Sequence, residues 1–277
     1  MKFSVCTVML PELTPEEAVK EIRNAGYEGV EWRVTHINKE RQNEPPSFWG
    51  NNLCTLEPTD VDAERARSLS ESSCLTIAAL DAYIPIGDIS ATKKILRFAQ
   101  ISAATQIRVG IWKLRDTSYK ALFKRARTFL QEIEDMTRRH GIKWLIETHQ
   151  KTICPSASST YKFVSHFDPE YVGVIFDPGN MVFEGYEDYR LSIEILGSYL
   201  AHVHLKNAAF TRPEGGGIWK ARWSPMEDGV VDFPKFIAAL KDAGYDGWMS
   251  MEDFSKARPC RETLRYNIKY IKNIINS

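Results

Sequence analysis

The chain has no surplus of charge of either sign. Its 277 residues contain 36 Lys and Arg against 36 Asp and Glu, so the formal net charge is zero. Proteins that bind nucleic acid usually carry a basic excess that neutralises phosphates. We therefore expect no nucleic-acid partner.

Long apolar runs and paired cysteines are also missing. The sequence has no apolar stretch of about 18 residues, which a membrane-spanning helix would need. The apolar start, MKFSVCTVML, ends before Pro11 and Glu12 and is too short for a secretory leader. The five cysteines are odd in number and form no CxxC pair, which is typical of reduced thiols. These absences predict a cytoplasmic protein with no membrane partner.

What the sequence does contain is a regular alternation of short apolar runs and longer amphipathic runs. The runs typical of buried strands are 3–8, 29–33, 75–80, 106–110, 142–147, 172–176, 200–205 and 247–252. Helical periodicity separates them, at 15–25, 60–73, 90–104, 117–139, 157–167, 186–197, 232–243 and 260–275. Strands that alternate with helices predict βαβ units and a parallel sheet.

The number of these units predicts a (β/α)8 TIM barrel that spans 1–277 as a single domain, because this α/β fold needs roughly 250 residues. The joints AGYEG at 25–29 and AGYDG at 243–247 indicate a repeated βα unit in which a glycine ends the helix. An open doubly wound sheet is the alternative. Such a sheet usually carries a glycine-rich turn after its first strand, and TVMLP at 7–11 contains no glycine.

Two connections, 34–58 after the second strand and 206–231 after the seventh, are longer than the fold requires. Long ordered loops on this side of a barrel often cover the active site. The run 215–217 consists of glycines, so we expect 206–231 to be a mobile lid that sets substrate preference. A rigid surface excursion or a subunit contact remains the alternative. The side chains expected to cover a substrate ring are Arg212, Trp112, Trp219 and Trp223, with core packing as the alternative for at least one tryptophan.

Polar side chains stand at the ends of four consecutive predicted strands, the fifth to the eighth. These are Glu147, Asp177, a histidine of the pair His202 and His204, and Glu252. Each alone would be read as a helix cap or a satisfied core residue. Together at one rim they would repel one another unless a cation lay between them. One nitrogen and three carboxylates suit one divalent ion, Mn, Mg, Co or Zn.

These residues stand in FDPGN at 176–180, HVHLKN at 202–207 and MSMED at 249–253. The set resembles the xylose isomerase-like barrel superfamily, and within it the sugar phosphate isomerase/epimerase family, which includes ketose 3-epimerases and inosose dehydratases. The similarity covers essentially the whole chain. It implies that the metal ligands are Glu147, Asp177, His204 and Glu252, with His202 in a supporting role.

The chain departs from two relatives at Asn180. Three-metal apurinic-site endonucleases, which share this fold, have a histidine there and an Asp-x-His pair after the seventh strand, and this chain has neither. Ketose 3-epimerases also tend to have a histidine at this position, where it helps to hold the substrate. The run ETHQKT at 147–152 resembles dehydroshikimate dehydratases, with Lys151 in place of a small residue.

The leading functional prediction is a metal-dependent isomerase or epimerase of a keto sugar, sugar acid or sugar phosphate. Glu147 and Glu252 would exchange the proton of the reacting carbon while the ion stabilises the enediolate. The alternative is a lyase that dehydrates a keto-polyol or keto acid, such as an inosose or dehydroshikimate. The first step is the same, so the sequence does not separate these readings. An apurinic-site endonuclease and a non-catalytic sugar-binding protein are less favoured.

A small sugar or polyol substrate needs polar side chains to hold it, and a homo-oligomer is left open. Arg33 and Lys206 are candidates for which a solvated rim position is an equal alternative. Glu31 has an inward phase on the second strand and is expected to orient a metal ligand, as is His202. The predicted substrate-binding residues are His149, Asn180, Lys206, Arg33 and Arg212.

Overall fold

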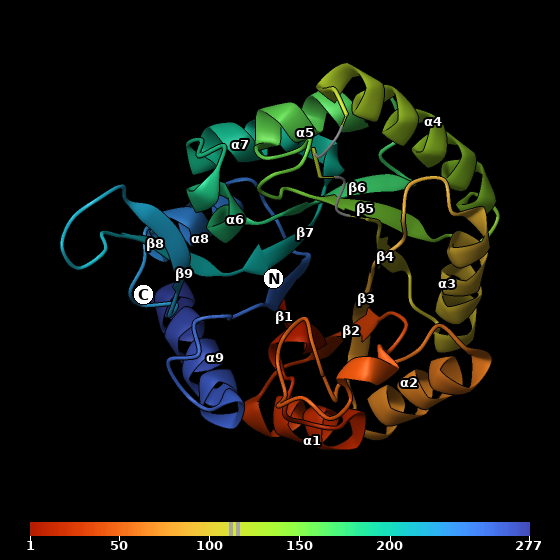
Figure 1. Ribbon diagram of the computed structural model, residues 1–277, viewed down its shortest axis with the longest axis horizontal. Coiled ribbons are helices and arrows are strands. Elements are labelled where there is room, and N and C mark those ends of the chain that lie inside the picture. Colours follow the sequence, from red (N-terminus) through yellow and green to blue (C-terminus); the bar gives the residue numbers. More distant parts are fainter. Residues whose placement is uncertain (111–112, 115–116) are drawn as a thin grey trace.

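The structure is a computed structural model that describes residues 1–110, 113–114 and 117–277. Its main sheet is a closed barrel of parallel strands in the order β1-β10-β7-β6-β5-β4-β3-β2 (Figure 1). The barrel strands are β1 (Lys2–Cys6), β2 (Gly29–Val34), β3 (Thr76–Ala82), β4 (Gln106–Arg108), β5 (Lys143–Glu147), β6 (Val172–Phe176), β7 (Leu200–Leu205) and β10 (Trp248–Met251). The predicted (β/α)8 barrel is confirmed, and the open-sheet alternative is wrong.

Helices surround the barrel as an outer ring (Figure 1). The ring helices are α1 (Pro15–Ala25), α2 (Asp60–Ser72), α3 (Ile89–Ser102), α4 (Tyr119–Thr137), α5 (Ala157–Val164), α7 (Tyr189–Leu196), α8 (Phe233–Asp242) and α9 (Cys260–Asn276). The short α6 (Pro178–Phe183) follows β6 directly and was not predicted. Among the described residues, no helix combines the length and apolar character needed to cross a membrane.

Local sequence signals explain where these helices begin and end. α1 starts with a capping box in which Thr14 and Glu17 bond each other's backbone N–H, and it ends at Gly26 with φ +96°. In α4, the predicted apolar face is buried at Leu122, Phe129 and Ile133. The helices therefore form where capping and periodicity agree.

The interior of the barrel changes from apolar to charged along the strands. Ala79, Leu145 and Ile175 form a small separate apolar cluster. Two residues further along β3 and β5, on the same faces, stand Asp81 and Glu147. A charged layer thus lies above an apolar floor, at the carboxyl ends of the strands, where barrel enzymes carry their active sites.

The two long connections are partly ordered. The first contains a 3₁₀ turn, η2 (Lys39–Arg41), and an isolated bridge between Pro46 and Asn51. Two more 3₁₀ turns, η1 (Thr7–Met9) and η3 (Gly197–Tyr199), lie elsewhere. The second folds into an antiparallel hairpin of β8 (Asn207–Thr211) and β9 (Lys220–Ser224), whose turn projects beyond the helix ring (Figure 1). These two strands were not predicted, because glycines and exposed polar residues obscure their alternation.

Candidate metal centre and substrate pocket

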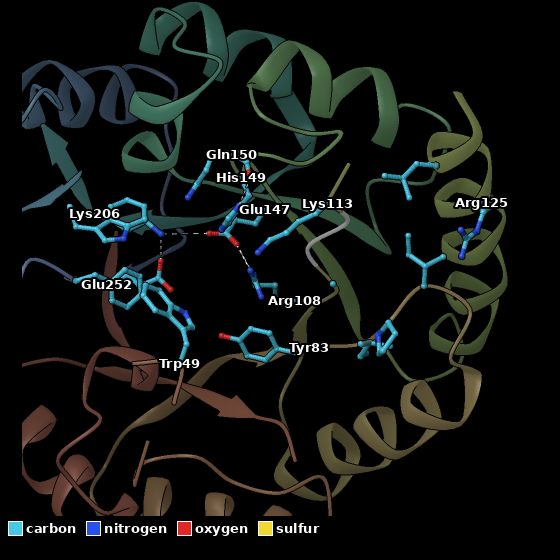
Figure 2. Close-up of a pocket in the computed structure, with 17 residues that line it drawn as sticks. Trp49, Tyr83, Arg108, Lys113, Arg125, Glu147, His149, Gln150, Lys206 and Glu252 are labelled. Atoms are coloured by element: carbon cyan, nitrogen blue, oxygen red, sulfur yellow. Dashed lines mark hydrogen bonds and ion pairs between the residues drawn. The ribbon is translucent and has the colours of Figure 1, made fainter. Parts of the chain in front are cut away.

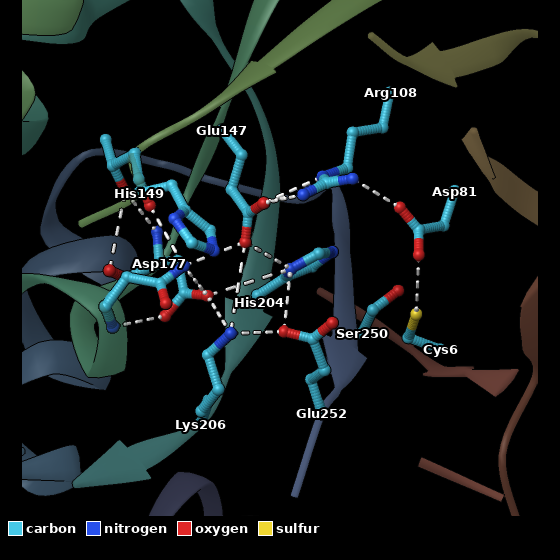
Figure 3. A network of polar contacts seen from close by, with 12 residues as sticks. Cys6, Asp81, Arg108, Glu147, His149, Asp177, His204, Lys206, Ser250 and Glu252 are labelled. Carbon is cyan, nitrogen blue, oxygen red and sulfur yellow. Dashed lines mark hydrogen bonds and ion pairs between the residues drawn. The ribbon is translucent and has the colours of Figure 1, made fainter. Parts of the chain in front are cut away.

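Four side chains meet at the carboxyl ends of neighbouring strands (Figure 3). They are Glu147 at the end of β5, Asp177 after β6, His204 in β7 and Glu252 after β10. One ligand atom from each lies within 4.8 Å of the others, and all four residues are buried. The structure therefore brings together the four predicted metal ligands.

The His204 ring points one nitrogen at the carboxylates and the other at Glu31. Its Nδ1 lies 3.3 Å from Glu147 Oε1 and 3.4 Å from Glu252 Oε2. Its Nε2 lies 3.2 Å from both carboxylate oxygens of Glu31. When Nε2–H donates to Glu31, the Nδ1 lone pair is aimed at the centre, which is the arrangement a metal-binding histidine needs.

His202 and Glu31 form a buried support beneath the centre. His202 Nε2 lies 3.2 Å from Glu31 Oε2 and 2.9 Å from Ser250 Oγ, while its Nδ1 lies 3.0 Å from Gln106 Oε1. Burial opposes ionisation of Glu31, yet His204 and His202 hold its pKa well below the ordinary value. The geometry fits the supporting roles predicted for both residues.

Asp177 acts as a helix cap and a member of the centre at the same time. Its Oδ1 accepts a hydrogen bond from the backbone N–H of Asn180 at 2.9 Å, which caps α6. Asn180 Nδ2 donates to Asp177 Oδ2 at 2.7 Å and to Glu147 Oε1 at 2.9 Å. Asn180 is fully buried and is absent from the pocket lining, so the structure places it as a bridge between two carboxylates.

Lys206 lies inside the centre and not at a solvated rim. It is 2% exposed, and its Nζ lies 2.7 Å from Asp177 Oδ2 and also forms an ion pair with Glu252. The ammonium stands over the rings of Trp223 and Phe254, 4.9 and 5.2 Å from their centroids. Arg33 is also buried, so the rim alternative is wrong for both cations.

Arg108 is the main residue of the centre that sequence analysis missed. From β4 it reaches Glu147 Oε2 with Nε and Nη2, at 2.7 and 2.6 Å, and Asp81 Oδ1 with Nη1 at 2.7 Å. Tyr83 donates a hydrogen bond to the other Asp81 oxygen at 3.0 Å. The sequence signal that could have revealed this pair is a charged residue in each of two neighbouring apolar strands, Asp81 in β3 and Arg108 in β4.

This clamp makes Glu147 a poor base. Burial opposes ionisation of Glu147, but Arg108 and the other cations hold its pKa well below the ordinary value. Its oxygens are already occupied by Arg108 and Asn180. Glu147 is therefore a weak proton acceptor in this arrangement.

His149 presents a different kind of nitrogen to the pocket. Its Nδ1–H donates to the backbone oxygen of Gln150 at 2.8 Å, which leaves the lone pair on Nε2. Burial lowers its pKa, with Glu147 opposing that effect. The ring is therefore a neutral base that lines the cavity above the four ligands.

A cavity of about 770 Å³ opens over this centre (Figure 2). Its polar floor includes Arg108, Glu147, His149, Lys206 and Glu252. Its aromatic walls are Trp49, Tyr83, Trp223 and Phe254.

Of the side chains predicted to cover a substrate ring, some line the cavity and others do not. Trp49, from the loop after β2, was not predicted, whereas Trp223 was. Trp219 is 60% exposed, and neither it nor the exposed Arg212 lines the cavity. Trp112 lies outside the described residues.

The residues of the centre fit a divalent cation. Burial raises the pKa of Asp177 to about 7, and Glu147 and Glu252 add to this effect against Lys206. Asp177 is thus hard to ionise even beside Lys206, and a divalent ion would supply the further positive charge that favours its ionised form. The donor set of one imidazole nitrogen and three carboxylates is the set expected for Mn, Mg, Co or Zn.

A closed parallel barrel with such a centre at the carboxyl ends of its strands defines a TIM-barrel protein of the enzyme type. Residues 19–274 match the model of the xylose isomerase-like TIM barrel family. The chain belongs to this family.

The similar proteins carry the names of two kinds of enzyme. Inosose dehydratase of Lacticaseibacillus casei is 22% identical, over 96% of this chain and 91% of that protein, and that of Clostridium perfringens strain 13 is 24% identical over the same shares. In structure, the chain resembles the probable 3-DHS dehydratase of petrobactin synthesis from Bacillus anthracis, with a TM-score of 0.75 and 20% identity over 99% of each chain. It also resembles D-psicose 3-epimerase of Clostridium cellulolyticum H10, with a TM-score of 0.72 and 14% identity over 99% of each chain.

Proposed function

We propose that the chain is a metal-dependent dehydratase, which removes a proton next to a ketone and expels a neighbouring hydroxyl group as water. The observation that carries this proposal is the contrast between the two glutamates, each of which pairs with a buried cation, and His149, which keeps a free lone pair. Arg108 and Asn180 occupy the oxygens of Glu147, whereas the Nε2 of His149 keeps a free lone pair beside the cavity. One free base suits an elimination better than a proton exchange between two glutamates.

The ion would be held by Glu147, Asp177, His204 and Glu252. When bound, it supplies positive charge beside the carbonyl and hydroxyl oxygens of the substrate, which favours loss of the adjacent proton. Glu31 holds the His204 ring in place through Nε2, and Arg108 holds Glu147.

His149 Nε2 would take the proton from the carbon next to the ketone. The C–H electrons form the new C=C bond, the bond to the neighbouring hydroxyl oxygen breaks, and the same proton passes from His149 to that oxygen, so that water leaves. Lys206 keeps a positive charge close to the developing negative charge, because its pKa is raised by Asp177 and Glu252 despite burial. Trp49, Trp223 and Phe254 would cover the apolar face of the substrate and exclude water.

The comparisons support this choice over the leading prediction of an isomerase or epimerase. The sequence relatives named above are inosose dehydratases, while epimerases occur among the structural neighbours at identities that carry the fold alone. The two-glutamate mechanism requires Glu147 to accept a proton, and the Arg108 clamp works against that.

A substrate panel tests the proposal. The manganese-loaded protein is incubated in deuterated water with an inosose, 3-dehydroshikimate, D-fructose and D-tagatose, and the products are identified by NMR. We expect loss of water from a cyclic hydroxy-ketone and no epimer of the free ketoses. A ketose epimer that gains deuterium, with no dehydration of the cyclic compounds, would assign the isomerase function instead.

A further inference from the structure

The loop that joins β2 to α2 supplies one wall of the cavity, the Trp49 ring (Figure 2). We propose that Arg33 and Asn52 are positioning residues, which together hold the backbone oxygen of Phe48 and so fix Trp49 over the cavity. The inference rests on the proposed function for its kinetic consequence, whereas the placement of Trp49 can be measured without a substrate.

Two buried donors meet at the backbone oxygen of Phe48. Arg33 Nη1 donates to it at 2.9 Å, and Asn52 Nδ2 donates to it at 3.1 Å. Asn52 Nδ2 also donates to Val8 O at 3.0 Å, in the turn that follows β1. Arg33 belongs to β2, and its backbone N–H donates to Thr7 Oγ1 at 2.8 Å. Both donors are therefore anchored to the barrel, and they fix the loop at one backbone atom.

Trp49 stands in a short turn of this loop. A bridge between Pro46 and Asn51 closes the turn. The rings of Phe48 and Trp49 both pack against Phe254, which follows β10, with centroid distances of 4.9 and 4.8 Å. Trp49 is 53% exposed, so these ring contacts cover only part of it. Its position therefore depends on how the backbone of the turn is held.

Arg33 contacts the walls of the cavity and not the cavity itself. It is 8% exposed, and it is not among the described residues that line the cavity. Its guanidinium lies 5.5 Å from the centroid of the Tyr83 ring, which does line the cavity. The hydrogen bond to Phe48 and the contact with Tyr83 offset part of the cost of burying this charge. The sequence predicted a direct substrate contact for Arg33, and this geometry favours an indirect one.

Loosening this anchor should change substrate binding and leave the chemical step intact. The four predicted metal ligands come from or follow β5, β6, β7 and β10, whereas Arg33 acts on the loop after β2. An apolar wall touches the substrate equally in the ground state and in the transition state. Its loss therefore raises KM and leaves kcat nearly unchanged.

The position of Trp49 is measured first, without a substrate. The protein is labelled with 5-fluorotryptophan, and the Trp49 resonance is the fluorine signal that disappears in Trp49→Phe. Arg33→Met and Asn52→Ala each remove one donor from Phe48 O. In both variants we expect the Trp49 resonance to sharpen and to move toward that of free 5-fluorotryptophan. Circular dichroism checks that each variant is folded, and Asn52→Ala decides the test if Arg33→Met does not fold.

Lys39→Met is the matched control for the loss of a cation. Lys39 is exposed and belongs to η2 in the same loop. Its side chain makes no contact on which the proposal depends. The Trp49 resonance and the KM of this variant should therefore equal those of the wild type.

A double-mutant cycle then tests whether Arg33 acts through Trp49. It uses the manganese-loaded protein and the cyclic hydroxy-ketone, inosose or 3-dehydroshikimate, that the wild type dehydrates. Trp49→Leu and Arg33→Met should each raise KM about fivefold at nearly constant kcat, the range expected for the loss of one aromatic contact. Adding Arg33→Met to Trp49→Leu should raise KM no further.

The outcomes separate the positioning role from the proposed function. A Trp49 resonance that stays in place in the folded variants would overturn the positioning role. KM effects that multiply in the double variant would also overturn it, because Arg33 would then act independently of Trp49. If the wild type dehydrates neither cyclic compound, the proposed dehydratase fails, and the Trp49 resonance alone decides the positioning role.

Discussion

Arg108 holds the Glu147 side of the centre. It joins Asp81 to Glu147 with bonds of 2.6 to 2.7 Å, in a position that is 4% exposed. A bidentate guanidinium fixes a carboxylate in direction as well as in charge. At the scale of single residues, the chemistry of each carboxylate therefore depends on the cation that holds it.

Removing this clamp should lower turnover without removing the ion. In Arg108→Met, Glu147 loses its orientation and faces a new repulsion from Asp81, so we expect kcat to fall roughly tenfold to a hundredfold. KM and metal content should change little. Arg97→Met, which removes an exposed ion pair with Asp60, is the control. An unchanged kcat in Arg108→Met would show that the orientation of Glu147 by Arg108 does not contribute to turnover.

His149 is the residue whose loss should abolish the proton transfer itself. His149→Ala should lower kcat by about 10²–10⁴-fold, the usual loss for a missing general base, while the protein keeps its metal. Added imidazole should restore part of the activity, because the cavity then has room for it. His140→Ala, at an exposed site, should behave as the wild type. Normal turnover in His149→Ala would show that another residue is the general base.

The sequence predicted the four ligands and the supporting Glu31 and His202, but not the pair Arg108 and Asp81. Strand ends reveal inward-facing side chains because the period of a strand is two residues, and four such ends stood out at Glu147, Asp177, His204 and Glu252. Arg108 and Asp81 were not predicted, because the role of each depends on the ion pair that it forms with the neighbouring strand. That pairing is a property of the closed barrel and not of either local sequence.

At the scale of elements, the hairpin of β8 and β9 is the clearest departure from expectation. Its base is fixed: Asn207 donates to Met226 O at 2.9 Å and accepts from Val231 N–H at 3.0 Å. Trp223 packs against Phe183, with ring centroids 4.5 Å apart. The hairpin thus brings one tryptophan to the pocket, and the mobility predicted for this loop stays a prediction.

The two tryptophans of the hairpin should respond differently to ligand. Trp223 lines the cavity and Trp219 is exposed near the turn. We expect Trp223→Phe to lose part of the fluorescence change caused by a bound ligand, and Trp219→Phe to keep all of it. The reverse result would mean that the turn folds over the pocket as a lid.

Element boundaries could be predicted where two signals agreed. The start and end of α1 carry a capping box and a glycine, and the prediction of 15–25 matches them. The hairpin and α6 were missed because they pack against each other, as Trp223 does on Phe183, and this contact joins segments far apart in the sequence. A two-stranded sheet is marginal alone, so its formation is not encoded in its own ten strand residues.

At the scale of the whole molecule, the barrel has a large apolar core that does not involve the ion. Removing metal with a chelator should therefore leave the far-UV circular dichroism unchanged. It should lower Tm only modestly, because the stabilisation lost is the free energy of metal binding. A chelated protein that is unfolded at 25 °C would contradict this prediction. The cytoplasmic location of the protein stays a prediction, and its oligomeric state stays open.

The central claim is that Glu147, Asp177, His204 and Glu252 hold one divalent ion. The most direct measurement is a calorimetric titration of manganese into chelator-stripped protein, for the wild type and for Asp177→Asn. Asparagine still caps α6, so the variant should fold while its charge at the centre is lost. The account predicts one ion per wild-type chain and greatly weakened binding in the variant. Undiminished binding in Asp177→Asn, or no binding to the wild type, would contradict it.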